Sequence, residues 1–219
     1  MDQRRLKKQV KQVAQRLLRH QGPKRWGSTK DPVTLLVETI LSHNTNDRNR
    51  DLAYRALKQT YPDWDAVLDA APDELARVIR PAGLNHQKAE RIQIALRTLL
   101  TEQGAYTLEH LMPMTVAQAR DWLMQLPGVG KKTAGIVLTF GLNKPYFAVD
   151  THINRITRRL GWVTDTQDAH DLMNVVVPPQ EMGSFHMQLI EHGRSTCKAR
   201  KPLCADCVLQ DLCLSHAER

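Results

Sequence analysis

Residues 126–134 read Leu-Pro-Gly-Val-Gly-Lys-Lys-Thr-Ala. Gly128 and Gly130, on either side of Val129, favour a tight hairpin that leads into a helix with its first backbone N–H groups pointing outward. Such N–H groups bind one phosphate without reading base sequence. Glycine-rich turns also join ordinary helices. The hairpin therefore indicates a phosphate site only together with other features of the chain.

The apolar residues recur mostly at intervals of three and four, which predicts an all-α fold. An N-terminal helix has an apolar stripe formed by Leu6, Val10, Val13 and Leu17. Asp31 and Pro32 read as the N-cap and first turn of the next helix, whose expected buried stripe is Leu35, Leu36, Ile40 and Leu41. Thr115 and Gln118 form a capping box. Further helices are expected near 47–59, 64–70, 73–80, 89–99, 131–141, 151–160, 168–176, 181–192 and 206–213.

The charge of the chain is unevenly distributed. Its 219 residues have a formal net charge of +8, and residues 1–30 hold ten basic side chains against Asp2 alone. A basic excess favours a polyanionic partner such as nucleic acid, although a solvated surface is the ordinary alternative. No apolar run approaches the roughly 20 residues of a membrane span, and residues 1–30 lack a signal-peptide core. We therefore expect a cytoplasmic, nucleoid-associated protein with no membrane partner.

The four cysteines are clustered in the last 23 residues with the spacing C-x6-C-x2-C-x5-C. They are Cys197, Cys204, Cys207 and Cys213. In an intracellular chain this favours a shared metal centre over disulfides. Structural zinc usually takes two paired knuckles, whereas here only Cys204 and Cys207 form one. The spacing therefore favours a [4Fe–4S] cluster, with zinc and disulfides as the alternatives.

Basic residues surround the first cysteine interval: Arg194, Lys198, Arg200 and Lys201. A loop fixed by metal ligation loses less entropy on binding phosphate than a flexible one does. We expect these four side chains to contact a nucleic acid backbone.

Lys132 and Asp150 are the candidate catalytic pair. An amine must lose its proton to act as a nucleophile, and a carboxylate can accept that proton and stabilise positive charge on a sugar. Taken singly, Lys132 reads as a phosphate contact and Asp150 as a helix N-cap. Their occurrence with the hairpin favours the catalytic interpretation.

Three motifs together resemble the helix-hairpin-helix DNA glycosylase superfamily, in particular its endonuclease III members: LPGVGKKTA at 126–134, AVDTH at 148–152 and the cysteine pattern. The resemblance continues upstream through LLVETILS at 35–42 and GLNHQKAERI at 83–92. It implies a six-helix barrel over 31–144 and an iron–sulfur domain formed by 1–30 with 145–219. It also implies a monomer that binds damaged or abasic double-stranded DNA across a groove between the two domains.

The resemblance implies a bifunctional enzyme that removes oxidised pyrimidines and then cleaves the abasic strand. Lys132 would be the nucleophile that forms a Schiff base, and Asp150 the essential carboxylate. The nucleophile would be Lys132 rather than Lys131, because adjacent helical positions point about 100° apart and only one can face the groove. Lys131 would contact DNA. Three further residues are expected to contact DNA near this pair: Gly128, Gly130 and His152.

Two loops are expected to enter the duplex where a nucleotide is flipped out. Asn44 occupies the position of the usual gap-filling glutamine and is one methylene shorter, so His43 is expected to contribute. Leu84 matches an apolar wedge between bases of the opposite strand. Its alternative role is that of an ordinary core leucine.

Two other functions remain open. Adenine or mismatch glycosylases without lyase activity share the cysteine spacing and the aspartate, but they usually lack the lysine and have a further C-terminal domain. A lesion-binding module with weak catalysis is the other alternative. Lys132 and the mere six residues that follow Cys213 disfavour the first alternative, and the presence of both Lys132 and Asp150 disfavours the second.

Overall fold

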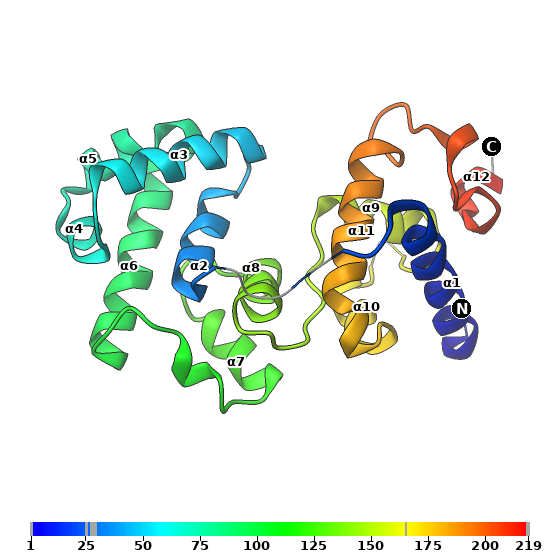
Figure 1. The fold of residues 1–219 in the computed structure, drawn as a ribbon, viewed down its shortest axis with the longest axis horizontal. Coiled ribbons are helices and arrows are strands. Elements are labelled where there is room, and N and C mark those ends of the chain that lie inside the picture. Colours follow the sequence, from blue (N-terminus) through cyan, green and yellow to red (C-terminus); the bar gives the residue numbers. More distant parts are fainter. Residues whose placement is uncertain (1, 25, 27–29, 165, 218–219) are drawn as a thin grey trace. The chain divides into compact units, whose positions relative to one another are not determined.

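The computed structural model describes residues 2–24, 26, 30–164 and 166–217, and this part of the chain contains helices and no strand. The all-α prediction is confirmed. The chain divides into two compact units (Figure 1), one formed by Ser28–Leu142 and the other by Met1–Gly27 with Asn143–Arg219. None of the helices in the described ranges is both long and apolar enough to cross a membrane.

The Ser28–Leu142 unit is built around two helices, α2 and α6. α2 packs against α3, α6 and α8, and α6 packs against α4 and α5. Its elements, in chain order, are α2 (Pro32–Leu41), α3 (Asp47–Thr60), α4 (Trp64–Asp69), α5 (Pro72–Val78), the 3₁₀ turn η1 (Arg80–Ala82), α6 (Asn85–Gln103), the 3₁₀ turn η2 (Glu109–Leu111), α7 (Val116–Leu123), α8 (Lys131–Ile136) and the π-helical turn η3 (Val137–Gly141).

Two predicted helix starts in this unit are confirmed. The Asp31 carboxylate accepts a hydrogen bond of 2.7 Å from the Thr34 backbone N–H, and the capping box of Thr115 and Gln118 is present at α7. The buried stripe of α2 differs at one position, because Leu35 is only half-buried. Val33 and Val37 are fully buried in its stead, so the stripe is rotated toward them.

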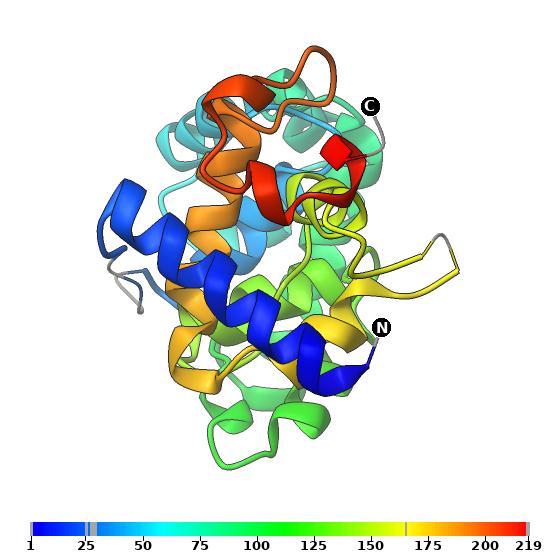
Figure 2. The ribbon, with the colours of Figure 1, turned by 90° about the vertical axis from the view of Figure 1, so that its right-hand side faces the viewer.

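The second unit is formed by both ends of the chain. Its elements are α1 (Gln3–Gln21), α9 (Thr151–Arg159), α10 (Ala169–Val176), η4 (Pro179–Glu181), α11 (Met182–Ser195), η5 (Cys204–Asp206), η6 (Gln210–Leu212) and α12 (Leu214–Ala217). α1 lies against α10 and α11, and α9 packs against α11 and α12 (Figure 2). A single apolar core includes side chains from α1, α9, α10 and α11.

The N-terminal helix is part of this core. All four positions of its predicted stripe are buried, with Val13 and Leu17 wholly inaccessible. Its polar side chains also reach the C-terminal segment, since the Gln9 amide donates to the Leu212 carbonyl (3.1 Å) and Arg16 donates to the Val208 carbonyl (3.1 Å). α1 therefore holds the segment that carries the last two cysteines.

Two predicted helices are wrong in part. The segment 206–213 is not an α-helix but contains short 3₁₀ turns, in which the backbone N–H of Cys207 bonds to the Cys204 carbonyl and that of Cys213 to the Gln210 carbonyl. The apolar spacing of 208–212 resembles a helix, but the tight turns orient the cysteines differently. The predicted helix 131–141 changes from α to π at Val137, and Leu142 N–H bonds to the Val137 carbonyl five residues earlier.

Candidate functional site

The hairpin between α7 and α8 is closed by a hydrogen bond of 3.0 Å from Val129 N–H to the Leu126 carbonyl. Gly128 has a φ of +80°, and a Cβ there would lie 2.5 Å from the Arg91 side chain. Gly130 is extended (φ −97°, ψ −176°), and a Cβ there would meet open space. The turn conformation therefore requires glycine at 128 only, a distinction that the sequence does not reveal.

Gly130 nevertheless has a consequence for α8. It is the N-cap residue of that helix, and no side chain caps the first backbone N–H groups. The N-terminus of a helix carries partial positive charge. Lys131 and Lys132 follow in the first turn, and both are half-buried. Positive charge is thus concentrated at the start of α8, as the sequence predicts.

His43 lies next to the candidate nucleophile. Its Nε2 is 2.9 Å from the hydroxyl of Thr133, the buried residue that follows Lys132. The pKa of His43 is lowered to about 4, first by burial and then by the positive charges of Lys132, Lys88 and Arg91. His43 is therefore neutral at physiological pH, in a strongly positive environment.

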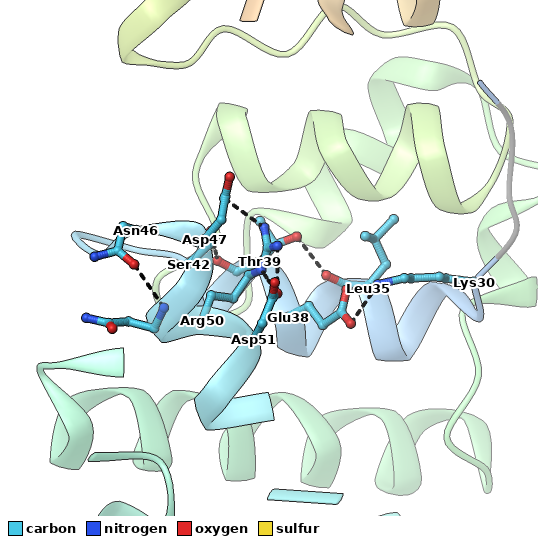
Figure 3. A network of polar contacts seen from close by, with 10 residues as sticks. Lys30, Leu35, Glu38, Thr39, Ser42, Asn46, Asp47, Arg50 and Asp51 are labelled. Atoms are coloured by element: carbon cyan, nitrogen blue, oxygen red, sulfur yellow. Dashed lines mark hydrogen bonds and ion pairs between the residues drawn. The ribbon is translucent and has the colours of Figure 1, made fainter. Parts of the chain in front are cut away.

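Asn44 lies in the middle of the loop 42–46 between α2 and α3. Figure 3 shows how the two ends of this loop are fixed: the Ser42 hydroxyl donates to the Thr39 carbonyl (2.7 Å), and the Asn46 side chain accepts from the Asn49 backbone (2.9 Å). Asn44 itself is exposed and has a left-handed φ of 51°. Non-glycine residues rarely adopt this conformation.

Leu84 is 53% exposed and has a φ of 45°, immediately before α6. This exposure rules out the alternative of a core leucine. An exposed leucine at a fixed, left-handed turn has the form expected of a wedge.

Asp150 lies in the other unit, as the N-cap of α9. Its Oδ1 accepts a hydrogen bond of 2.8 Å from the Ile153 backbone N–H. The N-cap interpretation of Asp150 is therefore correct, and it is compatible with catalysis because the cap uses one of two carboxylate oxygens. The cap also fixes the orientation of the carboxylate.

His152 is half-buried, where α9 meets α11. Its Nδ1 is 3.1 Å from an Arg155 guanidinium nitrogen, and a Cβ added at Gly193 would lie 2.7 Å from the His152 Cβ. His152 thus has a packing role that the sequence did not indicate.

The four cysteines line one cavity, together with side chains that include Arg159 and Leu203. All four are free thiols, so the disulfide alternative is not supported. Within the described residues, no three His, Cys, Asp or Glu side chains are close enough to hold a single metal ion. A zinc ion needs all its ligands around one point, whereas each thiolate of a [4Fe–4S] cluster binds a different iron. The donor set therefore fits the cluster.

Two further features of this cavity suit a cluster. The Arg159 guanidinium donates to the Cys197 sulfur at 3.2 Å, a contact that favours a thiolate. Burial raises the pKa of the Cys207 and Cys213 thiols. These groups become thiolates at neutral pH only when a strong cation is bound, as iron would be. Once bound, the cluster supplies cross-links among the segments that carry the cysteines.

The four basic side chains Arg194, Lys198, Arg200 and Lys201 are exposed. The backbone of their loop is held from α9: Arg159 donates to the carbonyls of Lys198 (2.8 Å) and Ala199 (3.1 Å), and Arg155 donates to that of Cys197 (2.9 Å). The sequence alone did not indicate this supporting role of Arg155 and Arg159. Their spacing of four, which places both on one helix face, was the available signal.

Comparison with known proteins agrees with this geometry. Residues 37–178 match the family model of the HhH-GPD superfamily base excision DNA repair proteins, and residues 197–213 match the iron–sulfur binding domain of endonuclease III. The chain is 37% identical over 191 residues to endonuclease III of Thermotoga maritima, covering 86% of this chain and 85% of that protein. It is 38% identical to endonuclease III of Synechocystis sp. over 84% of this chain and 81% of that one.

Solved structures show the same relationship. A trapped endonuclease III–DNA covalent intermediate superposes with a TM-score of 0.82 at 28% identity, over 97% of this chain and 98% of that chain. The predicted [4Fe–4S] cofactor is confirmed by the matching iron–sulfur domain. The chain belongs to the endonuclease III family within the HhH-GPD superfamily of base excision DNA repair proteins, and it is an enzyme of the DNA glycosylase and AP lyase class.

Proposed function

We propose that this enzyme binds double-stranded DNA as a monomer, releases oxidised pyrimidines and cleaves the resulting abasic strand. One observation carries the proposal: the loop of His43 and Asn44, the hairpin and Lys132 lie together in one unit, where the half-buried Lys132 and Arg91 create positive potential around His43. Positive potential attracts the phosphates that flank a flipped nucleotide. The endonuclease III–DNA complexes among similar structures support the same substrate.

In the proposed reaction the Lys132 amine attacks C1′ of the damaged nucleotide, and the bond between C1′ and the base breaks. Asp150 accepts the proton that the amine loses and balances the positive charge on the sugar. The C1′–O4′ bond then breaks, O4′ takes up a proton, and C1′ and the Lys132 nitrogen form the protonated Schiff base. Loss of a C2′ proton breaks the C3′–O3′ bond and expels the 3′ phosphate by β-elimination. Gly128, Gly130 and Lys131 hold a phosphate at the start of α8.

The remaining expected contacts surround this chemistry. Leu84 and Asn44 fill the space left by the extruded nucleotide, and the adjacent His43 contributes. Arg194, Lys198, Arg200 and Lys201 hold the DNA backbone, and His152, two residues after Asp150, is a further DNA contact. Recognition of a damaged base is favoured because it costs less to extrude than a paired one.

Borohydride trapping tests the proposal. Reduction of the imine should link the wild-type protein covalently to an abasic oligonucleotide. Lys132→Ala should abolish the adduct, whereas the matched variant Lys131→Ala should still form it with weaker DNA binding. An adduct that persists in Lys132→Ala would refute the assignment of the nucleophile.

The same oligonucleotides, carrying thymine glycol or a mismatch, define the reaction class when run with and without alkali. Strand cleavage without alkali is expected. Base release that needs alkali for cleavage would indicate the monofunctional glycosylase, and binding with neither product would indicate a lesion-binding module.

A further inference from the structure

Lys88 is a fully buried cation in the Ser28–Leu142 unit, with 0% of its surface exposed. Its ammonium group donates to the Leu41 carbonyl at 2.8 Å and to the Ala82 carbonyl at 2.7 Å. Burial and the nearby Arg91 lower its pKa to about 8, so it is still largely protonated at neutral pH. Neither the hairpin chemistry nor the cluster requires this group.

Among the residues that the structure describes, Lys88 has no acidic partner. None of the ion pairs formed among the described residues involves Lys88. Its partners are the carbonyls of the last residues of α2 and η1, where helix ends carry partial negative charge and lack intrahelical donors. Burying a charge is costly, and hydrogen bonds to such carbonyls offset part of that cost.

The two carbonyls lie just before the two loops that are expected to enter DNA. Three residues after Leu41 comes Asn44, with a φ of 51°, and two residues after Ala82 comes Leu84, with a φ of 45°. Both side chains are exposed and both backbones are left-handed, a conformation that asparagine tolerates and that leucine rarely populates. Such conformations persist where the surrounding structure holds them, and they cluster at functional sites.

We propose that Lys88 is a positioning residue that fixes the spacing between Asn44 and Leu84 and thereby enables nucleotide extrusion. Its single amine joins the end of α2 to the turn before α6, so the two loops cannot move apart independently. The bond between His43 and Thr133 then ties the first loop to the helix that carries Lys132. This inference rests on the proposed DNA contacts of Asn44 and Leu84.

The test separates extrusion from chemistry. Extrusion is followed by the fluorescence of 2-aminopurine placed beside a tetrahydrofuran abasic analogue in duplex DNA, which cannot form an imine. Chemistry is followed by borohydride trapping on a single-stranded abasic oligonucleotide, which needs neither wedge nor gap filler. Lys88→Met keeps an unbranched side chain that is one bond shorter, and it removes the amine.

Lys88→Met should slow extrusion by about tenfold while single-stranded trapping changes by less than about twofold. Lys88→Gln, whose amide reaches about one bond less far, should give an intermediate loss, and it replaces the methionine variant if that one does not fold. The control is Lys58→Met, a lysine that also donates to a carbonyl, that of Pro62 (3.0 Å), and it should change neither readout.

A double-mutant cycle tests the route of the effect. In an Asn44→Ala, Leu84→Ala background, adding Lys88→Met should slow extrusion by less than about twofold, because the residues it positions are gone. An undiminished tenfold effect there, or normal extrusion by a folded Lys88→Met protein, would overturn the proposal. Equal losses in both readouts would overturn it as well. A wild-type protein that extrudes but forms no adduct would instead refute the proposed lyase function.

Discussion

The N-terminal helix should contribute to the stability of the iron–sulfur unit through Leu17. This side chain is 0% exposed, whereas the adjacent Leu18 is 44% exposed on the same helix. The pair therefore offers a test at two neighbouring positions with identical chemistry. We expect Leu17→Ala to destabilise the unit strongly and Leu18→Ala to have little effect.

The expected magnitude follows from burial. Leu17→Ala removes three carbon atoms, worth about 2.4 kcal/mol of transfer free energy at about 0.8 kcal/mol each. The cavity left behind raises the loss to about 3–4 kcal/mol, within the range of buried leucine truncations. In a unit of about 100 residues this lowers Tm by about 12 °C or more. Leu18→Ala should stay within about 0.5 kcal/mol of the wild type.

Far-UV circular dichroism and the cluster absorbance at roughly 400 nm, recorded in one thermal scan, measure both effects. The two signals should fall together and at a lower temperature in Leu17→Ala, since Gln9 and Arg16 of the same helix bond to the segment 208–212. If both variants melted like the wild type, the N-terminal helix would be a dispensable basic tail. If the cluster signal alone kept its transition, the link between α1 and the cysteine segment would be refuted.

Two further predictions concern the hairpin and the histidine beside it. Gly128→Ala should lower the free energy of unfolding by about 1–3 kcal/mol, because the φ of +80° and the Arg91 side chain both exclude a Cβ. Gly130→Ala should lower it by less than about 1 kcal/mol. Urea unfolding measures both variants, and equal losses would contradict the conclusion that only position 128 requires glycine. The pKa of His43 is lower in the folded protein than in the unfolded chain, so the unfolded chain takes up a proton first as the pH falls. Titration of His43 therefore leaves the free energy of unfolding unchanged above about pH 6.5 and decreases it as the pH falls toward about 4. His43→Gln should reduce the dependence of unfolding free energy on pH between 4 and 7, and a variant with an unchanged pH profile would exclude this role.

Local signals in the sequence were reliable wherever a few neighbouring residues determine the structure. The Asp31 cap, the capping box at Thr115 and the N-terminal stripe depend on contacts within one or two helical turns, and the structure contains all of them. The segment 206–213 was mistaken for a helix because its apolar spacing is helical, whereas 3₁₀ turns set the directions of its cysteines. The periodicity of apolar residues does not reveal a backbone conformation that sets the directions of cysteines.

The roles of Lys88 and Arg159 cannot be inferred from the sequence, for a different reason. Lys88 looks like a solvated lysine in the first turn of α6, yet one of its acceptors is the Leu41 carbonyl, 47 residues away. Arg159 looks like one more surface charge, and it binds the Cys197 sulfur 38 residues further along the chain. Both roles depend on contacts that form only after the chain has folded.

This distinction also changes the meaning of the net charge of +8. Three of the basic side chains donate hydrogen bonds to backbone carbonyls of their own units: Lys88, Arg155 and Arg159. Phosphates release counterions to the extent that accessible cations neutralise them, so cations already bonded to the protein's own carbonyls add little to the salt dependence of binding. The exposed loop of Arg194, Lys198, Arg200 and Lys201 is therefore a better guide to DNA affinity than the total charge. Under the proposed function, Lys88, Arg155 and Arg159 act one step earlier, by fixing the backbones of the loops that would meet the DNA.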